Sequence, residues 1–368
     1  MKRILVFGMT ENPGGVESFL LNYYRNIDRG RFQFDFLCNS HQPVAYEDEL
    51  IQLGARCFHI TARSSNFFLF QKELDRLFRE HADEWRAIWV NVCSLANIDY
   101  LKIAKKYGVE RRIIHSHNSQ NMDSKLRVLL HKWNKRSIEN YATDFWACSQ
   151  DAAKWFYSDE LLDKTVVIHN AIDVERMKFD VEKRNAIRQQ YDLENKYVIG
   201  NVGRLHFQKN QKFAIDVFNE YHKDNPDSVL VLVGQGEDED DLKKQVASYG
   251  LKESVLFTGV QKDIQEWLSC FDLFLFPSRF EGLSMVALEA QANGLPVLAS
   301  QKAIPDGIKM YDHCVSLSLE EPAIGWSERL GEMKCLERVP FSQARHAFEE
   351  QGYDISVEIK KLERMLDG

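Results

Sequence analysis

The sequence predicts an α/β protein with two doubly wound domains. Short apolar segments alternate with longer amphipathic segments through most of the chain, and this rhythm restarts in the second half. Apolar strands that alternate with helices are typical of a parallel sheet covered on both faces. The length of 368 residues suits two domains of ordinary size, and 7 Trp, 13 Tyr and 23 Phe exclude a disordered chain.

The apolar segments give the expected strands, and the amphipathic segments give the expected helices. In the first half we expect strands at 3–7, 34–37, 56–60, 87–92, 112–115, 144–147 and 166–168, and helices at 16–26, 69–81 and 98–107. In the second half we expect strands at 197–202, 228–233, 255–258, 273–276 and 296–299, and helices at 211–224, 238–249, 261–270 and 283–293.

Two domains and a final helix follow from this pattern. Residues 1–172 form the expected N-terminal domain and residues 173–350 the C-terminal domain, joined around 170–179. Residues 351–368 hold a helix, at about 355–366, that can pack against either domain, the N-terminal one included. Ligands of such folds bind at the carboxyl ends of the strands, so we expect the two domains to face a cleft.

Charge and cysteine content limit the class of protein. The net charge of −8 argues against a general nucleic-acid binder, although residues 1–172 carry 23 Lys and Arg against 21 Asp and Glu. Seven cysteines without a Cys-x-x-Cys pattern fit a reducing cytoplasm better than a disulfide framework or a zinc site. The apolar start at 4–7 is too short for a signal peptide, and no run is long enough to span a membrane.

A glycine pair follows the first expected strand. Gly14 and Gly15 open a helix, where backbone N–H groups can approach an anion. The pattern is neither Gly-x-Gly-x-x-Gly nor a P-loop, so it does not indicate a nicotinamide or ATP site. A tight strand-to-helix turn is the alternative interpretation.

Two histidines end the strand at 112–115. Alternation along an extended strand places His115 and His117 on the same side of the sheet, where an active site of this architecture lies. A structural role is the alternative, and we find no third or fourth ligand at a spacing that would complete a metal site.

The second half opens with a strand, a glycine and two cations that are five residues apart. Arg204 offers a planar fork and Lys209 a point charge, and this combination can bind a pyrophosphate. The alternative is a pair of solvated surface cations.

The segment after the strand 273–276 carries the most informative pattern. Gly282 lets the backbone pass close to a ligand, and the amides of Leu283 and Ser284 begin a helix whose positive end points outward. Gly294 is expected to end that helix.

Two carboxylates accompany this helix. Glu281 lies just before it and Glu289 about two turns along it, and both can accept hydrogen bonds from sugar hydroxyls. The apolar neighbours of Glu289 mean that its carboxylate needs a partner.

The pattern Pro-Ser-x-x-Glu-Gly, six residues, then Glu-Ala-x-Ala-x-Gly-x-Pro-Val, which contains Glu281 and Glu289, resembles the signature of glycosyltransferase family 4. Further matches follow in order at 14–15, 115–118, 169–173, 203–204 with 209, 233–236 and 257–259. The likeness runs from residue 1 to about 300 and is close to capsule and exopolysaccharide members, whereas residues 301–320 depart from the family. It implies retaining enzymes of the GT-B fold, with two Rossmann-like domains facing a cleft.

The resemblance assigns roles to individual residues. It implies that Arg204 and Lys209 hold the donor diphosphate, and that Glu289 binds the nucleotide ribose. Other expected donor contacts are Gly15, Glu281 and the backbone of Gly282, Leu283 and Ser284, with Glu281 next to the transferred sugar. His117 matches the family histidine beside the reacting sugar better than His115 does.

The expected activity is transfer of a hexose or N-acetylhexosamine from a nucleotide diphosphate sugar, UDP-linked in our expectation, to a glycan or lipid-linked acceptor in surface polysaccharide synthesis. A nucleotide-sugar epimerase of the same fold and a non-catalytic nucleotide-sugar-binding subunit are the alternatives. No cofactor or metal is expected, because the one Asp-x-Asp, at 238–240, lies in an acidic run that opens a helix.

A basic amphipathic segment at 125–136 suggests where the protein works. Leu126, Leu129, Leu130 and Trp133 form one apolar stripe at helical spacing, among five cations and no acid. Such a helix suits reversible, peripheral contact with an anionic membrane, here the inner face of the cytoplasmic one. The alternative is that the stripe packs into the protein's own core.

Overall fold

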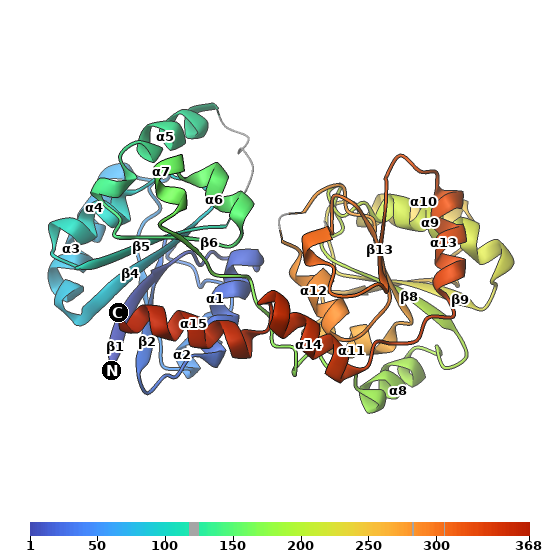
Figure 1. Ribbon diagram of the computed structural model, residues 1–368. Helices are drawn as coiled ribbons and strands as arrows, with labels where there is room; N and C mark the ends of the chain where they lie inside the picture. Colours follow the sequence, from blue (N-terminus) through green and yellow to red (C-terminus); the bar gives the residue numbers. More distant parts are fainter. Residues whose placement is uncertain (118–124, 282, 305) are drawn as a thin grey trace. The chain divides into compact units, whose positions relative to one another are not determined.

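The computed structural model describes residues 1–117, 125–281, 283–304 and 306–368, and the chain forms two compact units (Figure 1). Unit 1 comprises Met1–Ala171 and Ile355–Gly368, and unit 2 comprises Ile172–Asp354. The chain therefore changes unit at Ala171 and again at Asp354, so that its last helix belongs to unit 1.

Unit 1 contains a seven-stranded parallel sheet in the order β3-β2-β1-β4-β5-β6-β7. The strands are β1 (Lys2–Phe7), β2 (Phe32–Cys38), β3 (Arg56–His59), β4 (Trp85–Val92), β5 (Arg111–Ser116), β6 (Asp144–Ala147) and β7 (Thr165–Val167). The helices are α1 (Gly15–Asn26), α2 (Glu47–Gln52), α3 (Phe67–His81), α4 (Asp99–Lys106), α5 (Lys125–Lys135), α6 (Gln150–Phe156), α7 (Asp159–Leu162) and α15 (Ile355–Asp367).

Unit 2 contains a six-stranded parallel sheet in the order β10-β9-β8-β11-β12-β13. The strands are β8 (Tyr197–Val202), β9 (Ser228–Val233), β10 (Val255–Gly259), β11 (Leu273–Phe276), β12 (Val297–Ser300) and β13 (Cys314–Leu317). The helices are α8 (Val181–Gln190), α9 (Gln211–Asp224), α10 (Glu239–Ser248), α11 (Ile264–Cys270), α12 (Met285–Ala292), α13 (Ala323–Met333) and α14 (Phe341–Gln351).

Both faces of each sheet are covered, which explains why the strands are apolar throughout. In β1, Leu5 packs into the core on one side of the sheet, whereas Ile4 and Val6 pack into the core on the other side. In unit 2 the same division places Val231 on one side and Leu230 and Leu232 on the other.

Helix α15 returns the end of the chain to unit 1, where it lies beside α1 (Figure 1). Its buried side chains Ile355, Ile359, Leu362 and Leu366 recur every three or four residues and join the core that α1 also covers. The two chain ends meet, because Lys2 Nζ donates to the Asp367 carbonyl at 2.8 Å.

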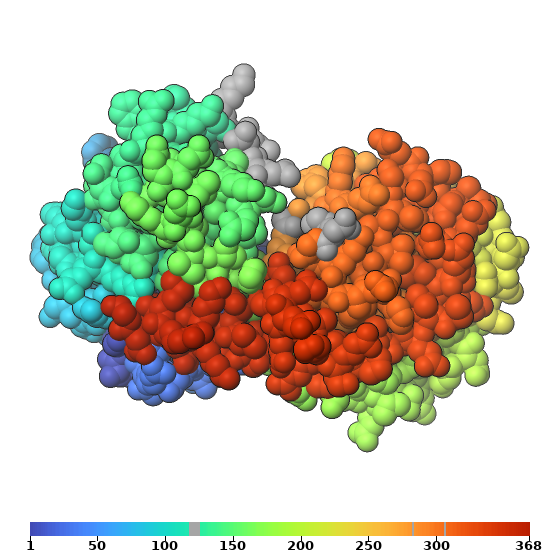
Figure 2. Space-filling model, in the orientation of Figure 1, coloured from blue at the N-terminus to red at the C-terminus, as the bar shows by residue number. Residues whose placement is uncertain are grey.

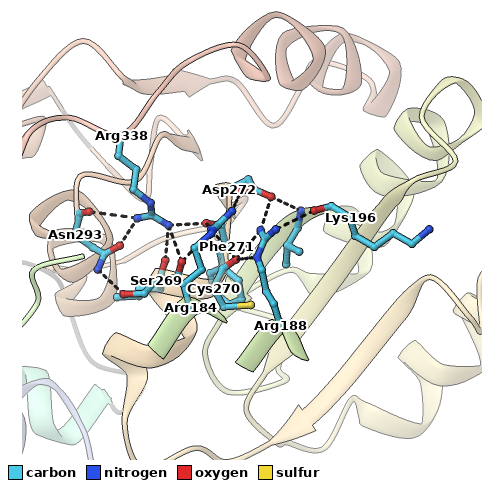
Figure 3. A network of polar contacts seen from close by, with 11 residues as sticks. Arg184, Arg188, Lys196, Ser269, Cys270, Phe271, Asp272, Asn293 and Arg338 are labelled. Atoms are coloured by element: carbon cyan, nitrogen blue, oxygen red, sulfur yellow. Dashed lines mark hydrogen bonds and ion pairs between the residues drawn. The ribbon is translucent and has the colours of Figure 1, made fainter. Parts of the chain in front are cut away.

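The amino-terminal ends of β8 and β11 are fixed by an arginine network (Figure 3). Arg184, Arg188 and Arg338 donate to the last carbonyls of α11 and to the residues just after it. Asp272 accepts from Arg184 at 2.5 Å and from Arg188 at 2.6 Å, and its carboxylate also accepts from Val198 N at 2.8 Å. The network therefore ties α8 and α11 to the first residues of the two central strands, at the opposite end from the candidate site.

Candidate functional site

The predicted donor residues of unit 2 lie where the sheet order reverses. The chain runs from β8 to β9 and β10 on one side, and then from β11 to β12 and β13 on the other. Open α/β sheets bind ligands at the carboxyl ends of their strands at such a switch point. The loops that leave β8 and β11 there carry Arg204, Lys209 and Glu281.

These two loops are bonded to each other. Lys209 Nζ lies 2.8 Å from Glu281 Oε1, and both side chains are largely buried, at 20% and 8% exposed. Arg279 N donates to the Gln208 carbonyl at 2.8 Å, and Asn210 Nδ2 donates to the Pro277 carbonyl at 3.1 Å. The structure thus brings together two residues that the sequence assigned separately, one to phosphate and one to sugar.

Glycines bring the loop after β9 close to the loop after β8. Gly203 has a φ of +154°, and a Cβ there would lie 3.1 Å from Lys209 Cε, so the lysine stem packs across the glycine. A Cβ on Gly234 would lie 2.1 Å from the Gly203 carbonyl oxygen, and a Cβ on Gly236 would lie 2.2 Å from that of Leu205. The loops after β8 and β9 therefore run backbone against backbone.

Arg204 has a different partner. Its guanidinium Nη2 lies 3.0 Å from Glu237 Oε2, and its side chain is 69% exposed. The carboxylate of Glu237 accepts a hydrogen bond from its own backbone and lies near Arg204 and His206. These interactions hold the pKa of Glu237 below its usual range. Each predicted phosphate-binding cation is thus paired with a different carboxylate, and Arg204 remains accessible to an incoming anion.

Helix α12 is the helix whose positive N-terminal end the sequence places after Glu281. It begins at Met285, so the expectation of a helix from residue 283 was wrong, and Ser284 is its extended N-cap residue. The Ser284 hydroxyl is buried and has no hydrogen-bond partner among the described residues. Leu283 is half-buried against the core of unit 2, and Gly282 lies outside the described residues. Gly294, at a φ of +76°, follows the end of the helix.

Glu289 is half-buried on α12. No side-chain hydrogen bond or ion pair joins it to another described residue, and burial raises the pKa of Glu289 to about 7, against a smaller opposing effect of Arg176. A carboxylate in this position gains a partner if a ligand hydroxyl donates to it.

The two histidines of unit 1 have different surroundings. Their rings lie on the same side of the sheet, as predicted, with centroids 4.2 Å apart. His115 is completely buried beside Trp89 and Phe19, whereas His117 is half-buried just beyond β5. Burial lowers the pKa of His117 to about 3, so this ring is neutral at physiological pH.

Asn91 selects the tautomer of His117. Asn91 Nδ2 donates to the Trp89 carbonyl at 3.4 Å, so its Oδ1 is the atom that faces His117 Nε2 at 2.9 Å. That oxygen can only accept, so His117 carries its proton on Nε2. The Nδ1 atom is then an acceptor; it is buried and has no hydrogen-bond partner among the described residues.

The glycine loop of unit 1 is held by Glu17. The Glu17 carboxylate accepts from Thr10 N at 3.1 Å and from Thr10 Oγ1 at 2.6 Å. Gly15 is the first residue of α1, and a Cβ there would meet no atom within 4 Å. The N-terminus of α1 is therefore open at the residue that the resemblance assigns to the donor.

A cavity of about 570 Å³ lies at the switch point of unit 1, between the ends of β1 and β4. Its lining includes Phe7, Arg63, Cys93, Tyr100 and Arg127. Aromatic and cationic side chains thus border the same space.

Three contacts of the candidate site were not predicted, although each left a signal in the sequence. Asn91 is the one polar residue of the predicted strand 87–92, Glu237 directly follows the Gly-Gln-Gly segment, and Glu17 follows the glycine pair. Within the described ranges, no three His, Cys, Asp or Glu side chains are arranged to hold a metal ion. None of the helices in the described part of the chain has both the length and the apolar composition needed to cross a bilayer.

Sequence comparison gives a family match to the second unit. Residues 183–309 match the family described as glycosyl transferases group 1. The matched range contains Arg204, Lys209, Glu281 and Glu289, together with the loops that position them.

Two curated relatives align with most of the chain. EpsF of Bacillus subtilis (strain 168), which is named as a glycosyltransferase, is 28% identical over 370 residues, covering 98% of this chain and 95% of its own. The UDP-Gal:alpha-D-GlcNAc-diphosphoundecaprenol alpha-1,3-galactosyltransferase of Escherichia coli is 27% identical over 299 residues, covering 78% of this chain and 76% of its own.

Solved structures share the fold over the whole chain. HepE of Anabaena, crystallised with UDP, has a TM-score of 0.78 at 19% identity, with 100% of both chains covered. A glycosyltransferase from Rickettsia africae has a TM-score of 0.79 at 16% identity, with 100% of this chain and 98% of that chain covered. The chain thus has the two Rossmann-like units of GT-B glycosyltransferases, and its match to glycosyl transferases group 1 and its relatives support a glycosyltransferase.

Proposed function

We propose that this protein is a retaining glycosyltransferase of family 4 that moves a hexose or N-acetylhexosamine from a UDP-sugar to a glycan or lipid-linked acceptor in capsule or exopolysaccharide synthesis. The observation that carries the proposal is the joining of the loops after β8 and β11 by the Lys209–Glu281 pair, beside the N-terminus of α12. UDP as the nucleotide is supported by the crystal complexes of the Anabaena protein with UDP and UDP-glucose, and by the Escherichia coli relative, which is named for transfer from UDP-Gal.

In this proposal unit 2 binds the donor. Arg204 and Lys209 bind the diphosphate, and the amides at Leu283 and Ser284 add the positive end of α12. As the bond between the sugar and the diphosphate breaks, negative charge develops on the leaving phosphate, and these fixed donors stabilise it. In this proposal these donors, and not a metal ion, stabilise the diphosphate.

The two glutamates have separate roles. Glu289 accepts from the ribose hydroxyls, which give its half-buried carboxylate a partner. Glu281, oriented by Lys209 at 2.8 Å, accepts from hydroxyls of the transferred sugar. The acceptor hydroxyl attacks on the face from which the diphosphate leaves, and no covalent glycosyl-enzyme is proposed.

Unit 1 is proposed as the acceptor-binding part. His117 receives the role that the resemblance implies, a contact to the reacting sugar, through the acceptor atom Nδ1 that Asn91 leaves open. We place the reaction in the cytoplasm, in keeping with seven cysteines that are all free thiols.

The test is a ligand panel followed by a product assay. UDP-sugars should raise the unfolding temperature more than GDP- or ADP-sugars at equal concentration, because only the bound ligand stabilises the folded state. With the best donor, NMR of the product should show the anomeric configuration of the donor retained. Conversion of the sugar without any acceptor would instead identify an isomerase, and binding with neither transfer nor slow hydrolysis would identify a non-catalytic subunit.

A further inference from the structure

The two predicted phosphate ligands of unit 2 and their partners form a neutral cluster. Arg204 is paired with Glu237 and Lys209 with Glu281, so the charges of the four side chains sum to zero. A nucleotide diphosphate adds negative charge to this cluster. The cluster can attract the diphosphate strongly only if one of the two cations is released from its carboxylate.

Burial decides which pair can open. Lys209 and Glu281 are 20% and 8% exposed, so separating them would leave a buried carboxylate without its partner. A lysine has three donors, and Lys209 can contact phosphate while it keeps Glu281. Arg204 and Glu237 are 69% and 49% exposed, so water can solvate both side chains after they separate. The Arg204–Glu237 pair is therefore the one that opens at low cost.

The backbone of Glu237 is fixed beside the loop that carries Arg204. Leu205 N donates to the Gln235 carbonyl at 3.0 Å, and Asp238 N donates to the Leu205 carbonyl at 3.2 Å. The residues on both sides of Glu237 are thus bonded to the residue that follows Arg204. Glu237 can move its side chain, but the carboxylate always stays within reach of the guanidinium.

His206 offers Glu237 a second partner. Gln208 N donates to His206 Nδ1 at 3.2 Å, so the neutral ring carries its proton on Nε2. His206 Nε2 lies 3.4 Å from Glu237 Oε1, whereas Arg204 Nη2 lies 3.0 Å from Oε2. The carboxylate therefore retains an N–H group beside it when Arg204 turns to another anion.

We infer that Glu237 sets the affinity of the donor site for phosphate by competing with it for Arg204. The inference rests on the proposed function and adds a positioning residue to it. In the free protein Glu237 holds the guanidinium, and when the diphosphate binds, Arg204 exchanges the carboxylate for phosphate oxygens. Part of the binding energy is used to separate the pair, so Glu237 weakens the hold on the nucleotide that must leave after sugar transfer.

Calorimetric titration with UDP tests this competition. Glu237→Gln should raise the affinity for UDP about fivefold, because Arg204 then has no ionised competitor. In stopped-flow displacement the gain should appear mainly as slower dissociation of UDP. The affinity for uridine, which carries no phosphate, should not change. The unfolding temperature should not change either, because the pair is exposed.

Glu239 provides the matched control. It is the first residue of α10, and its carboxylate is paired with Lys243 at 2.6 Å. The part of the chain around α9 and α10, yellow in Figure 2, reaches the surface of unit 2. Glu239→Gln removes the same charge from the same segment without removing a partner of Arg204. It should therefore raise the affinity for UDP less than about twofold.

The Arg204→Ala background separates competition from general charge repulsion. Without Arg204 nothing remains to compete for, so Glu237→Gln should raise UDP affinity less than about twofold in this background. Equal gains in the wild-type and Arg204→Ala backgrounds would overturn the inference, as would equal gains in Glu237→Gln and Glu239→Gln. UDP affinity that Glu237→Gln leaves unchanged would overturn it while the proposed donor site stands. Absence of UDP binding to the wild-type protein would refute both.

Discussion

At the residue scale, the two glutamates of unit 2 differ in what compensates their charge. Glu281 is paired with Lys209 at 2.8 Å, whereas Glu289 lies half-buried on an apolar helix and burial raises its pKa to about 7. The first carboxylate is held by the protein, and the second depends on what binds beside it. This difference leads to separate predictions for the two positions.

Uridine binding should depend on pH through Glu289. The raised pKa means that the free protein holds a proton on Glu289 up to about pH 7, while ribose hydroxyls donate best to the ionised form. Affinity for uridine should therefore rise from about pH 5 to about pH 7 and then level off. Uridine carries no phosphate, so no ligand phosphate titrates in this range. In Glu289→Gln the affinity should be lower and independent of pH; a flat wild-type profile would refute the ribose assignment.

Loss of either predicted phosphate ligand should weaken UDP binding, but with different effects on stability. Arg204→Ala and Lys209→Ala should each cost about 1.5–3 kcal/mol of binding free energy in calorimetry. Lys209→Ala should also lower the free energy of unfolding by about 2 kcal/mol, because it leaves the buried Glu281 without its partner. Arg204→Ala should leave the free energy of unfolding unchanged, because the Arg204 side chain is exposed.

A double variant separates these two effects. Lys209→Met with Glu281→Gln removes both charges of the pair, so it should recover most of the lost stability without recovering UDP affinity. Recovery of both would mean that Lys209 acts on the fold alone.

At the element scale, the apolar rhythm of the sequence located the strands that are buried on both faces. Tyr197–Val202, Ser228–Val233 and Leu273–Phe276 match the predicted bounds. Strand β13 was not predicted, because Cys314–Leu317 is short, Ser316 interrupts its apolar residues, and Val315–Leu317 are only partly buried. A continuous apolar run is the signal of a central strand, and an edge strand does not need one.

Helices that are held by polar contacts were also difficult to predict. Helix α8 has few apolar residues, and Arg184 and Arg188 attach it to the end of α11. The stripe on α5 was predicted, but its direction was not, because His131 and Asn134 bind the backbone of Leu95, which lies far away in the sequence. Periodicity shows which residues share a face and not what covers that face.

The arginine network should be important for stability. Asp272→Ala leaves Arg184 and the buried Arg188 without their carboxylate, so the free energy of unfolding should fall by about 3 kcal/mol in urea titrations. The control is Asp227→Ala, whose side chain is 84% exposed and, among the described residues, forms an ion pair only with Lys196; this variant should cost less than about 1 kcal/mol. Equal losses in the two variants would contradict the role given to the network.

At the scale of the whole molecule, composition and rhythm predicted two parallel α/β domains, and the structure contains them. The motif residues could be found because they follow strand ends, where ligands bind. Their partners could not: Lys209 and Glu281 are 72 residues apart, and His117 and Asn91 are 26 apart. Only the sheet order brings such residues together.

Metal independence is a prediction for the whole enzyme. Sugar transfer should proceed in EDTA at nearly the rate seen with Mg²⁺, because side chains and backbone amides stabilise the leaving diphosphate. Asp238→Asn with Asp240→Asn should leave activity unchanged, since these residues lie at the start of α10. Activity that is lost in EDTA, restored by Mn²⁺ and abolished by this double variant would refute the prediction.

The central claim is that the carboxyl ends of β8 and β11 in unit 2 bind the nucleotide diphosphate, and hydrogen–deuterium exchange with UDP tests it most directly. Saturating UDP should slow amide exchange in the loops at 203–210 and 277–284 and in the first turn of α12. Exchange at the opposite end of the same strands, around Asp272 and Arg188, should not change. Protection at that opposite end, or none in the two loops while calorimetry shows UDP bound, would contradict the account.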